Sequence, residues 1–331
     1  MHLYTFNKRA DWKAELADAI TSVDELLRLL QLPPDDDRLL LKPEFRLLVP
    51  RAFVNKMQVG NPDDPLLRQV LPLALEDAPG GCQDPVGDLG AMPTPGLLHK
   101  YRGRVLLLTT GACAIHCRYC FRRHFPYASA NPCKSRWQQA LDYLTAHDDI
   151  EEVILSGGDP LVMDNDKLGQ LLGALERVSH IRWLRIHTRL PVVLPTRIDD
   201  ALVLQLQQRR FKTTLVIHAN HANELMSHEA DALRHLTAGG VTLLNQSVLL
   251  RGVNDSAAAL IALSKRLYDI GVLPYYLHLL DPAEGVMHFD VPQSRAIEIL
   301  STLQAELPGF LVPRLVRETP GAASKTAIFT I

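Results

Sequence analysis

From Arg104 onward, short apolar runs typical of β-strands recur about thirty residues apart. Six runs predict strands over Val105–Thr109, Glu152–Leu155, Trp183–His187, Thr213–His218, Val241–Val248 and Pro274–Leu279. Between them, apolar residues at helical spacing predict amphipathic helices over Ser135–Thr145, Lys167–Arg177, Asp200–Arg209, Glu224–Thr237 and Ala257–Ile270. A further strand is predicted over Leu311–Glu318. The alternation predicts parallel βα units, and six units favour an α/β fold with a partial (β/α)6 barrel over a closed eight-fold one.

The chain before the first of these strands has a different pattern. Apolar residues at helical spacing predict one helix over Asp11–Gln31, which a pair of prolines ends. The segment Asn61–Pro95 is rich in Pro, Gly and Asp and predicts irregular chain with one short helix near Leu66–Leu75. We therefore expect two parts, a mainly helical extension over residues 1–98 that acts as a cap or a subunit contact, and the barrel over residues 99–331.

The chain has 331 residues, 47% of them hydrophobic, and a formal net charge of −2. That balance gives no sign of a general affinity for nucleic acid or membranes. No apolar run approaches the length of a membrane span, and the first ten residues, MHLYTFNKRA, lack the apolar stretch of a signal peptide. An odd number of cysteines, five, fits the reducing cytoplasm better than a disulfide framework. Two of them, Cys82 and Cys133, stand apart and are expected to be structural or incidental.

The other three cysteines lie within eight residues, directly after the first predicted strand. The segment TTGACAIHCRYC places Cys113, Cys117 and Cys120 at C-x3-C-x2-C spacing. A [4Fe–4S] cubane normally takes four cysteines, so three thiolates hold three irons and leave one iron open to a ligand. The same segment also allows a zinc site with His116 or His124 as fourth ligand, or cysteines that bind no metal.

The run CAIHCRYC, with an aromatic residue before its last cysteine, resembles the signature of the radical S-adenosylmethionine (SAM) superfamily. The resemblance implies that the open iron binds SAM and that one electron from the cluster cleaves SAM to a 5′-deoxyadenosyl radical. The segment SGGDP is similar to the family's glycine-rich segment, where glycine lets a ligand approach the main chain, although the same residues are ordinary in turns. The implied SAM-binding residues are Ser156, Gly157, Gly158, Asp159, His218 and Gln246.

A narrower resemblance runs from about His99 to Ala327. The segments YRGRVLLLTTGACAIHCRYCFRRHF, LSGGDPL, NQSVLLRGVND and YLHLLDPAEGVMHF closely resemble the lysine 2,3-aminomutase family. Members of that family are isomerases that use pyridoxal 5′-phosphate (PLP) as well as SAM, and they move an amino group of lysine from the α to the β carbon. The resemblance therefore implies an L-lysine aminomutase with a [4Fe–4S] cluster, SAM and PLP as cofactors.

The same resemblance places the PLP-binding lysine near the end of the chain. The segment ETPGAASKTAI matches a run in the family that is more uniformly glycine, and Lys325 falls at the lysine that forms a Schiff base with PLP. Composition alone favours a solvated lysine in a tail at this position. Tyr101 and Arg104, with Lys100 as a further candidate, are the implied ligands of the PLP phosphate.

Charge complementarity indicates how lysine would be bound. A guanidinium pairs bidentately with a carboxylate, and Arg122 lies where the family has its carboxylate-binding arginine. The adjacent Arg123 is expected to be a solvated neighbour. Asp281 matches one of two family aspartates for the ε-ammonium, and Glu318 stands in the place of the other with one extra methylene. Two acids favour a cationic substrate, although either acid alone is equally compatible with a surface carboxylate.

The chain also resembles the shorter branch of this family, which supplies (R)-β-lysine for attachment to translation elongation factor P by a separate ligase. It stops at Ile331 with no cysteine after Cys133, so we expect it to lack the zinc-binding tail of longer members. The expected partners are lysine, elongation factor P with its ligase, and an electron donor such as flavodoxin or ferredoxin. The alternatives are an aminomutase for another basic amino acid, such as ornithine or arginine, a non-catalytic iron–sulfur protein, and a zinc-binding interaction module.

Overall fold

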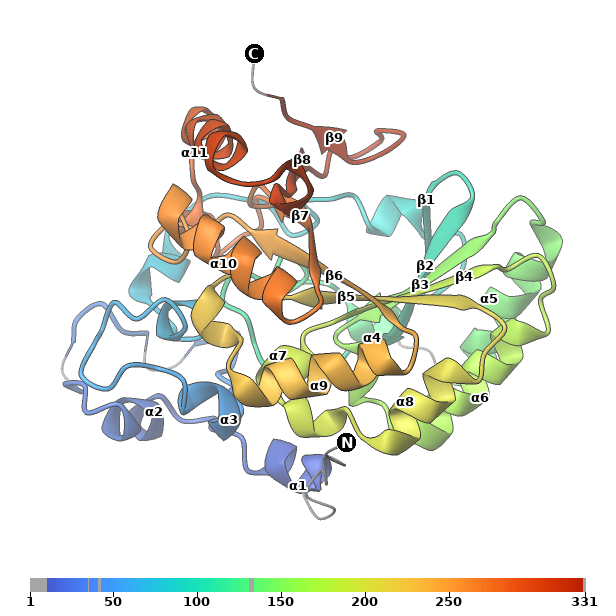
Figure 1. The fold of residues 1–331 in the computed structure, drawn as a ribbon, viewed down its shortest axis with the longest axis horizontal. Helices are drawn as coiled ribbons and strands as arrows, with labels where there is room; N and C mark the ends of the chain where they lie inside the picture. Colours follow the sequence, from blue (N-terminus) through green and yellow to red (C-terminus); the bar gives the residue numbers. More distant parts are fainter. Residues whose placement is uncertain (1–10, 35, 41–42, 131–133, 330–331) are drawn as a thin grey trace.

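A nine-stranded sheet forms the centre of the protein in a computed structural model, which describes residues 11–34, 36–40, 43–130 and 134–329. Each strand lies next to the one that follows it in the chain (Figure 1). Neighbouring strands from β2 to β8 are parallel, whereas β1 and β9 pair antiparallel with β2 and β8. The strands are β1 Leu97–Tyr101, β2 Arg104–Thr110, β3 Glu152–Gly157, β4 Trp183–Thr188, β5 Lys212–His218, β6 Thr242–Val248, β7 Leu273–His278, β8 Arg314–Arg317 and β9 Thr326–Ala327.

Helices connect the parallel strands and lie around the outside of the curved sheet (Figure 1). The side chains of Asp164, Asp199 and Ser256 accept hydrogen bonds from the backbone at the starts of α6, α8 and α10, which is why these helices begin there. Across the described chain, no helix combines the length and apolar character needed to cross a bilayer. The helices are α4 Tyr127–Ala130, α5 Lys134–Ala146, α6 Asn165–Glu176, α7 Leu190–Val193, α8 Asp200–Gln207, α9 Ser227–Ala238, α10 Ala257–Asp269 and α11 Gln293–Glu306, with short 3-10 turns at Pro160–Val162, Pro195–Arg197, Ala222–Glu224, Met287–Phe289 and Gly309–Leu311.

The structure confirms the prediction of a partial barrel of parallel βα units. The six predicted strands correspond to β2 to β7, and the further strand over Leu311–Glu318 corresponds to β8. The antiparallel edge strands β1 and β9 were not predicted, because each is held by pairing with a neighbour rather than by a strong pattern of its own.

The prediction of one helix over Asp11–Gln31 is wrong. The segment forms two short helices, α1 (Trp12–Ala17) and α2 (Val23–Leu29), and Ile20 between them pairs with Val49 in a β-bridge. The Ser22 hydroxyl accepts a hydrogen bond from Glu25 N at 3.4 Å and so caps the second helix. The rest of the extension holds α3 (Arg51–Val54) and 3-10 turns at Leu67–Gln69, Ala74–Asp77 and Leu89–Ala91, two of which replace the short helix predicted near Leu66–Leu75.

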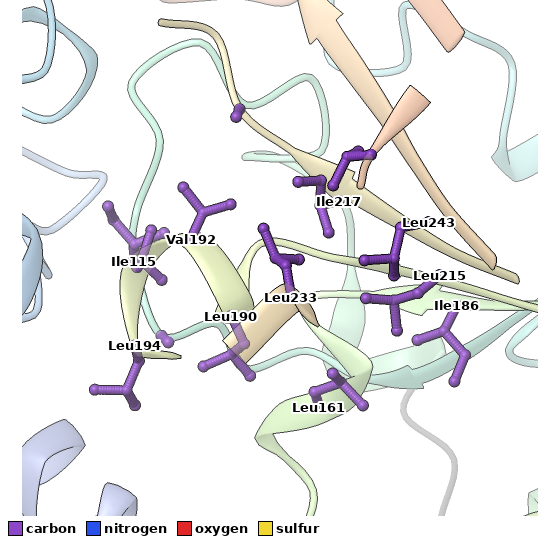
Figure 2. Packing of buried hydrophobic residues seen from close by; sticks show 14 of the residues in the cluster. Ile115, Leu161, Ile186, Leu190, Val192, Leu194, Leu215, Ile217, Leu233 and Leu243 are labelled. Carbon is purple, nitrogen blue, oxygen red and sulfur yellow. The ribbon is translucent and has the colours of Figure 1, made fainter. Parts of the chain in front are cut away.

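Alternate side chains along the strands point either into a packed core or into an inner cavity. Ile186 and Leu215 point from β4 and β5 towards the helices and pack in one cluster with Leu233 of α9 (Figure 2). Arg185 and His187, which flank Ile186 on β4, instead line the cavity. Because successive side chains of a strand point to opposite faces, the same strands supply both the core and the site.

The extension shares this core. Trp12, Leu26 and Phe53, one from each of α1, α2 and α3, belong to the same hydrophobic cluster as the barrel residues. Phe53 is fully buried there. The extension is therefore packed on the barrel through apolar side chains, and this contact positions its polar residues beside the cavity.

Candidate active site

A cavity of about 660 Å³ is lined by side chains from every one of the strands β2 to β8. All of the residues predicted to bind the cluster, SAM, PLP or lysine line this cavity: Tyr101, Arg104, Cys113, Cys117, Cys120, Arg122, Ser156, Gly157, Gly158, Asp159, His218, Gln246, Asp281, Glu318 and Lys325. We call the side with Cys113, Cys117 and Cys120 the cluster end, and the side with Tyr101, Asp281, Glu318 and Lys325 the lysine end. Residues that are distant in sequence thus meet around one space.

The loop that carries the three cysteines follows β2 and is held by apolar packing and by backbone hydrogen bonds. Ile115 is 4% exposed and packs in the main hydrophobic cluster (Figure 2). The backbone N–H groups of His116 and Arg118 donate to the carbonyls of Leu48 and Gln69, each at 2.9 Å. The extension therefore supplies backbone acceptors that fix the cysteine loop.

A buried ion-pair group braces the same loop from the side of the extension. The fully buried Arg118 pairs with Glu76, to which its Nε donates at 2.7 Å. Arg123 also donates to Glu76, at 2.9 Å, and its side chain is only 7% exposed. The prediction that Arg123 is a solvated neighbour is therefore wrong, because a buried acid in the extension holds it in place.

The two histidines that a zinc site would recruit have other contacts. His116 Nδ1 lies 2.8 Å from the Arg46 carbonyl, and its ring stacks on Phe45. His124 Nε2 lies 3.2 Å from the Glu284 carbonyl. In the described part of the chain, no three His, Cys, Asp or Glu side chains are grouped for a single metal ion. A cubane cluster does not need three side chains around a single ion, because each cysteine binds a different iron.

The three cysteines are partly buried, and polar groups lie beside them. Burial raises the pKa of Cys113, and it raises the pKa of Cys120 to about 11. Cys117 Sγ accepts a hydrogen bond from Arg189 Nη1 at 2.7 Å. Cys82 is exposed, while Cys133 lies outside the described residues. A loop with three cysteines facing one cavity fits a [4Fe–4S] cluster with one iron open to a ligand.

The SGGDP segment lies directly against the cysteine loop. A Cβ added at Gly158 would come within 2.1 Å of the Ala112 carbonyl oxygen, so only glycine fits there. The N–H groups of Gly158 and Asp159 donate to the carbonyls of Thr110 and Ala112 at 2.7 and 2.8 Å. An amino group donates its own hydrogen bonds, so at this segment carbonyl oxygens would be its acceptors.

The carboxylate of Asp159 is bonded to neighbouring groups of the protein. It accepts hydrogen bonds from Leu161 N, Thr188 Oγ1 and Arg189 N at 3.0, 2.7 and 2.7 Å. Burial raises the pKa of Asp159, although these bonds favour the charged form. Its side chain therefore ties the segment after β3 to the turn after β4.

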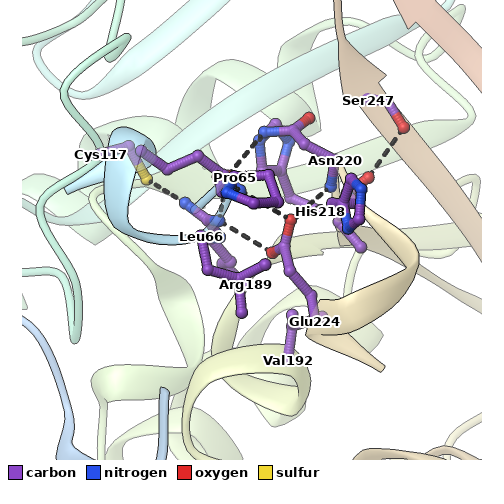
Figure 3. Close-up of polar contacts among 12 residues, drawn as sticks. Pro65, Leu66, Cys117, Arg189, Val192, His218, Asn220, Glu224 and Ser247 are labelled. Atoms are coloured by element: carbon purple, nitrogen blue, oxygen red, sulfur yellow. Dashed lines mark hydrogen bonds and ion pairs between the residues drawn. The ribbon is translucent and has the colours of Figure 1, made fainter. Parts of the chain in front are cut away.

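His218 ends β5 beside the cluster end. Its Nε2 lies 2.8 Å from the Tyr119 hydroxyl, and the two rings stack with centroids 5.6 Å apart. Burial lowers the pKa of His218 to about 3, so the ring is neutral. Figure 3 shows His218 next to Asn220 and Glu224, in a polar group that continues to Arg189 and Cys117.

At the lysine end, Lys325 is paired rather than solvated. Its Nζ donates to Glu318 Oε2 at 2.6 Å, and one quarter of its side chain is exposed. The Tyr101 hydroxyl donates to the other carboxylate oxygen of Glu318. The Arg104 guanidinium lies 4.8 Å from the centroid of the Tyr101 ring, in a cation–π contact. A lysine amine and a tyrosine hydroxyl that share one carboxylate, with an arginine nearby, fit the amine and phosphate needs of PLP.

Arg122 is held by a residue that the sequence analysis missed. Its Nε donates to Asp88 Oδ2 at 2.6 Å, and Lys100 Nζ lies 2.6 Å from the other oxygen of Asp88. Burial alone would raise the pKa of Asp88, but the charges of Arg122 and Lys100 lower it below its usual value. Asp88 lies in the irregular Pro- and Gly-rich segment of the extension, where no local pattern distinguishes it from other surface acids.

Asp281 fits a cationic ligand. Its Oδ1 is buried and has no hydrogen-bond partner among the described residues. Burial raises its pKa to about 7, while Lys325 lowers it. A buried carboxylate without a partner is unfavourable unless a cation or donor completes it. An ammonium group in this part of the cavity would do so.

Several known proteins are similar to this chain. Residues 102–183 match the family described as a 4Fe-4S single cluster domain. The chain is 49% identical over 99% of its length to the L-lysine 2,3-aminomutase of Escherichia coli, of which it covers 97%, and 48% identical over 96% of its length to that of Haemophilus influenzae, of which it covers 95%. A radical SAM methyltransferase from Sphaerobacter thermophilus has a TM-score of 0.44 and 16% identity over 67% of this chain and 68% of that one. On the strength of its full-length relatives, the chain belongs to the L-lysine 2,3-aminomutase family.

Proposed function

We propose that the protein converts L-α-lysine to (R)-β-lysine, using a [4Fe–4S] cluster, SAM and PLP. The observation that carries this proposal is the arrangement of one cavity. Three cysteines on a braced loop line its cluster end, while the Lys325–Glu318 pair and the unpartnered Asp281 line its lysine end. When bound, the cluster with SAM supplies a carbon-centred radical, and PLP supplies a conjugated system that stabilises an unpaired electron on the substrate.

The residues of the chain would bind and orient the reactants. Cys113, Cys117 and Cys120 hold the cluster; Ser156, Gly157, Gly158, Asp159, His218 and Gln246 form the SAM site; Tyr101 and Arg104 hold the PLP phosphate; and Lys325 binds PLP covalently. Arg122 would pair with the α-carboxylate of lysine, because its Nε is fixed by Asp88 and its terminal nitrogens face the cavity, where Nη1 makes a long contact of 3.4 Å to Ser156 Oγ. Asp281 and Glu318 would pair with the ε-ammonium, and the surrounding strands exclude water from the radical.

The finer parts of the proposal rest on the branch resemblance. The product is used to modify elongation factor P through a separate ligase, a flavodoxin or ferredoxin supplies the electron, and the reaction takes place in the cytoplasm. We also propose that residues 1–98 serve this site as a bracing extension of the barrel over 99–331, since Glu76 and Asp88 reach its arginines. Modification of purified elongation factor P in a coupled assay with the ligase tests the link to translation.

The test of the reaction is anaerobic turnover of L-lysine by the full chain, with reconstituted cluster, PLP, SAM and dithionite. We expect β-lysine of R configuration by chiral chromatography, and a loss of turnover on the order of 10³-fold or more in Cys117→Ala and in Lys325→Ala. Lys325→Ala should keep its iron and lose the PLP absorbance band, whereas Cys117→Ala should lose iron. Full turnover in Lys325→Ala would contradict the assignment of PLP to this residue.

The second candidate is an aminomutase for another basic amino acid. It is favoured by Glu318, which reaches further than the aspartate of the family and is already paired with Lys325. Turnover of lysine, ornithine and arginine, compared by kcat/KM, separates the two. A higher value for ornithine than for lysine would replace lysine as the substrate and leave the cofactor assignments unchanged.

A further inference from the structure

The guanidinium of Arg189 lies against the sulfur of a predicted cluster ligand. Its Nη1 donates a hydrogen bond to Cys117 Sγ at 2.7 Å. Arg189 directly follows β4, and its side chain is only 6% exposed. A hydrogen bond between a buried cation and a thiolate is charge-assisted and stronger than a neutral one. No role among those proposed above uses this residue.

Three further contacts prevent Arg189 from turning away. Its Nη2 donates to Gln69 Oε1 at 2.6 Å and to Glu224 Oε2 at 2.9 Å. Its backbone N–H donates to Asp159 Oδ2 at 2.7 Å. Figure 3 shows Arg189 between Cys117 and Glu224, with the dashed contacts on either side. The side chain is therefore fixed from the extension and from the 3-10 turn after β5, and the backbone is fixed from the segment after β3.

The charge of Arg189 is maintained although the residue is buried. A guanidinium keeps its proton in proteins, and Glu224 pairs with this one at 2.9 Å. Glu224 has no exposed side-chain surface, and its other oxygen accepts from the backbone N–H groups of Asn220 and His221 at 2.8 and 3.0 Å. The result is a positive charge at the sulfur that is partly balanced by one acid.

We propose that Arg189 is a positioning residue that raises the reduction potential of the cluster by donating to the Cys117 thiolate. The inference rests on the proposed function, since it requires a cluster on Cys117. When an external reductant adds one electron, negative charge increases on the iron–sulfur core and on its cysteine sulfurs. A fixed N–H donor and a positive charge stabilise that reduced state more than the oxidised state. Glu224 opposes the effect, because its negative charge lies against the same guanidinium.

The test is a redox titration of the full-chain protein, loaded anaerobically with iron and sulfide and followed by electron paramagnetic resonance of the reduced cluster. Neither lysine nor SAM is added, so the readout is independent of turnover. In Arg189→Gln we expect the equilibrium constant for reduction to fall about tenfold, which is about 59 mV for a one-electron couple. In Arg189→Lys, which keeps the charge without the planar fork, we expect a smaller fall.

Two matched variants separate this effect from loss of structure. Arg197 is also fully buried, but its Nε and Nη2 donate to the carbonyls of Leu161 and Met163 at 2.6 and 3.1 Å rather than to a cysteine. Arg197→Gln should lower the melting temperature and leave the potential of the cluster unchanged. Glu224→Gln removes the opposing charge, so it should shift the potential in the positive direction, opposite to Arg189→Gln.

The following results would overturn the inference. An unchanged potential in fully loaded Arg189→Gln, or shifts of the same sign in Arg189→Gln and Glu224→Gln, would overturn the inference alone. Loss of iron from both Arg189 variants while Arg197→Gln stays loaded would show that Arg189 only supports the loop, and would also overturn it. A wild-type protein that takes up no cluster would overturn the proposed function and this inference with it.

Discussion

At the cluster end of the cavity, charged side chains are paired with partners that no substrate has to displace. Arg118 and Arg123 share Glu76, and Arg189 is paired with Glu224. At the lysine end, the charges that would bind substrate and cofactor are paired with one another instead. Lys325 is bonded to Glu318.

This difference matches what each end has to do. A cluster that stays bound through many turnovers gains from a rigid loop whose charged side chains have permanent partners. A site that exchanges substrate needs charges that remain solvated or paired when it is empty and that can change partners when lysine enters. Asp281 is an exception, because its buried oxygen Oδ1 has no hydrogen-bond partner within the described chain.

The largest effect is expected from removing Asp88, the acid that joins the two ends of the cavity. Asp88 holds Lys100 and Arg122, whose side chains are only 18% and 9% exposed. In Asp88→Asn we expect the free energy of unfolding to fall by about 3 kcal/mol, because two buried cations lose their anion. Urea unfolding measures this. Glu151→Gln, in an exposed pair with Arg182, is the control and should change stability by less than about 1 kcal/mol. Equal effects would mean that Asp88 is not an internal support.

A smaller effect is expected from shortening the acid at the lysine end. Glu318→Asp removes one methylene from the carboxylate that contacts Lys325 at 2.6 Å. We expect the ratio of kcat/KM for lysine to that for ornithine to change by about tenfold, the usual effect of one methylene in a binding pocket. The potential of the cluster should not change. A cluster potential that moved with this substitution would show that the two ends are not independent.

The smallest effect is a pH dependence. Above pH 7 the Asp281 carboxylate is charged and ready to pair with an ammonium, whereas below its pKa of about 7 it must first lose a proton. The KM for lysine should therefore rise several-fold between pH 8 and pH 6, while lysine itself stays charged. Inhibition by norleucine, which lacks the ammonium, serves as the control and should show no such rise. A parallel rise for norleucine would assign the titration to another group.

The sequence predicted those parts of the site that depend on local pattern. The C-x3-C-x2-C spacing and the alternation of strands and helices are visible within short windows, so the cysteine loop and the barrel follow from them. His218 at the end of β5 was predicted, and Arg189 just after β4 is visible as a polar residue that follows an apolar strand. Their partners were not, because nothing in the sequence links Arg189 to Glu224 or to Gln69. Such pairings depend on how distant segments pack together.

The bond from Tyr101 to Glu318 joins residues 217 positions apart, whereas the three cysteines lie within eight residues of one another. Closing a long loop of chain is entropically costly and slow, while a short loop closes readily. During synthesis on the ribosome, the cysteine loop and the early strands emerge well before the segment that carries Glu318 and Lys325. The order of assembly therefore follows the topology: the cysteine loop can form early, whereas the contact between Tyr101 and Glu318 forms only after the last segment has been made.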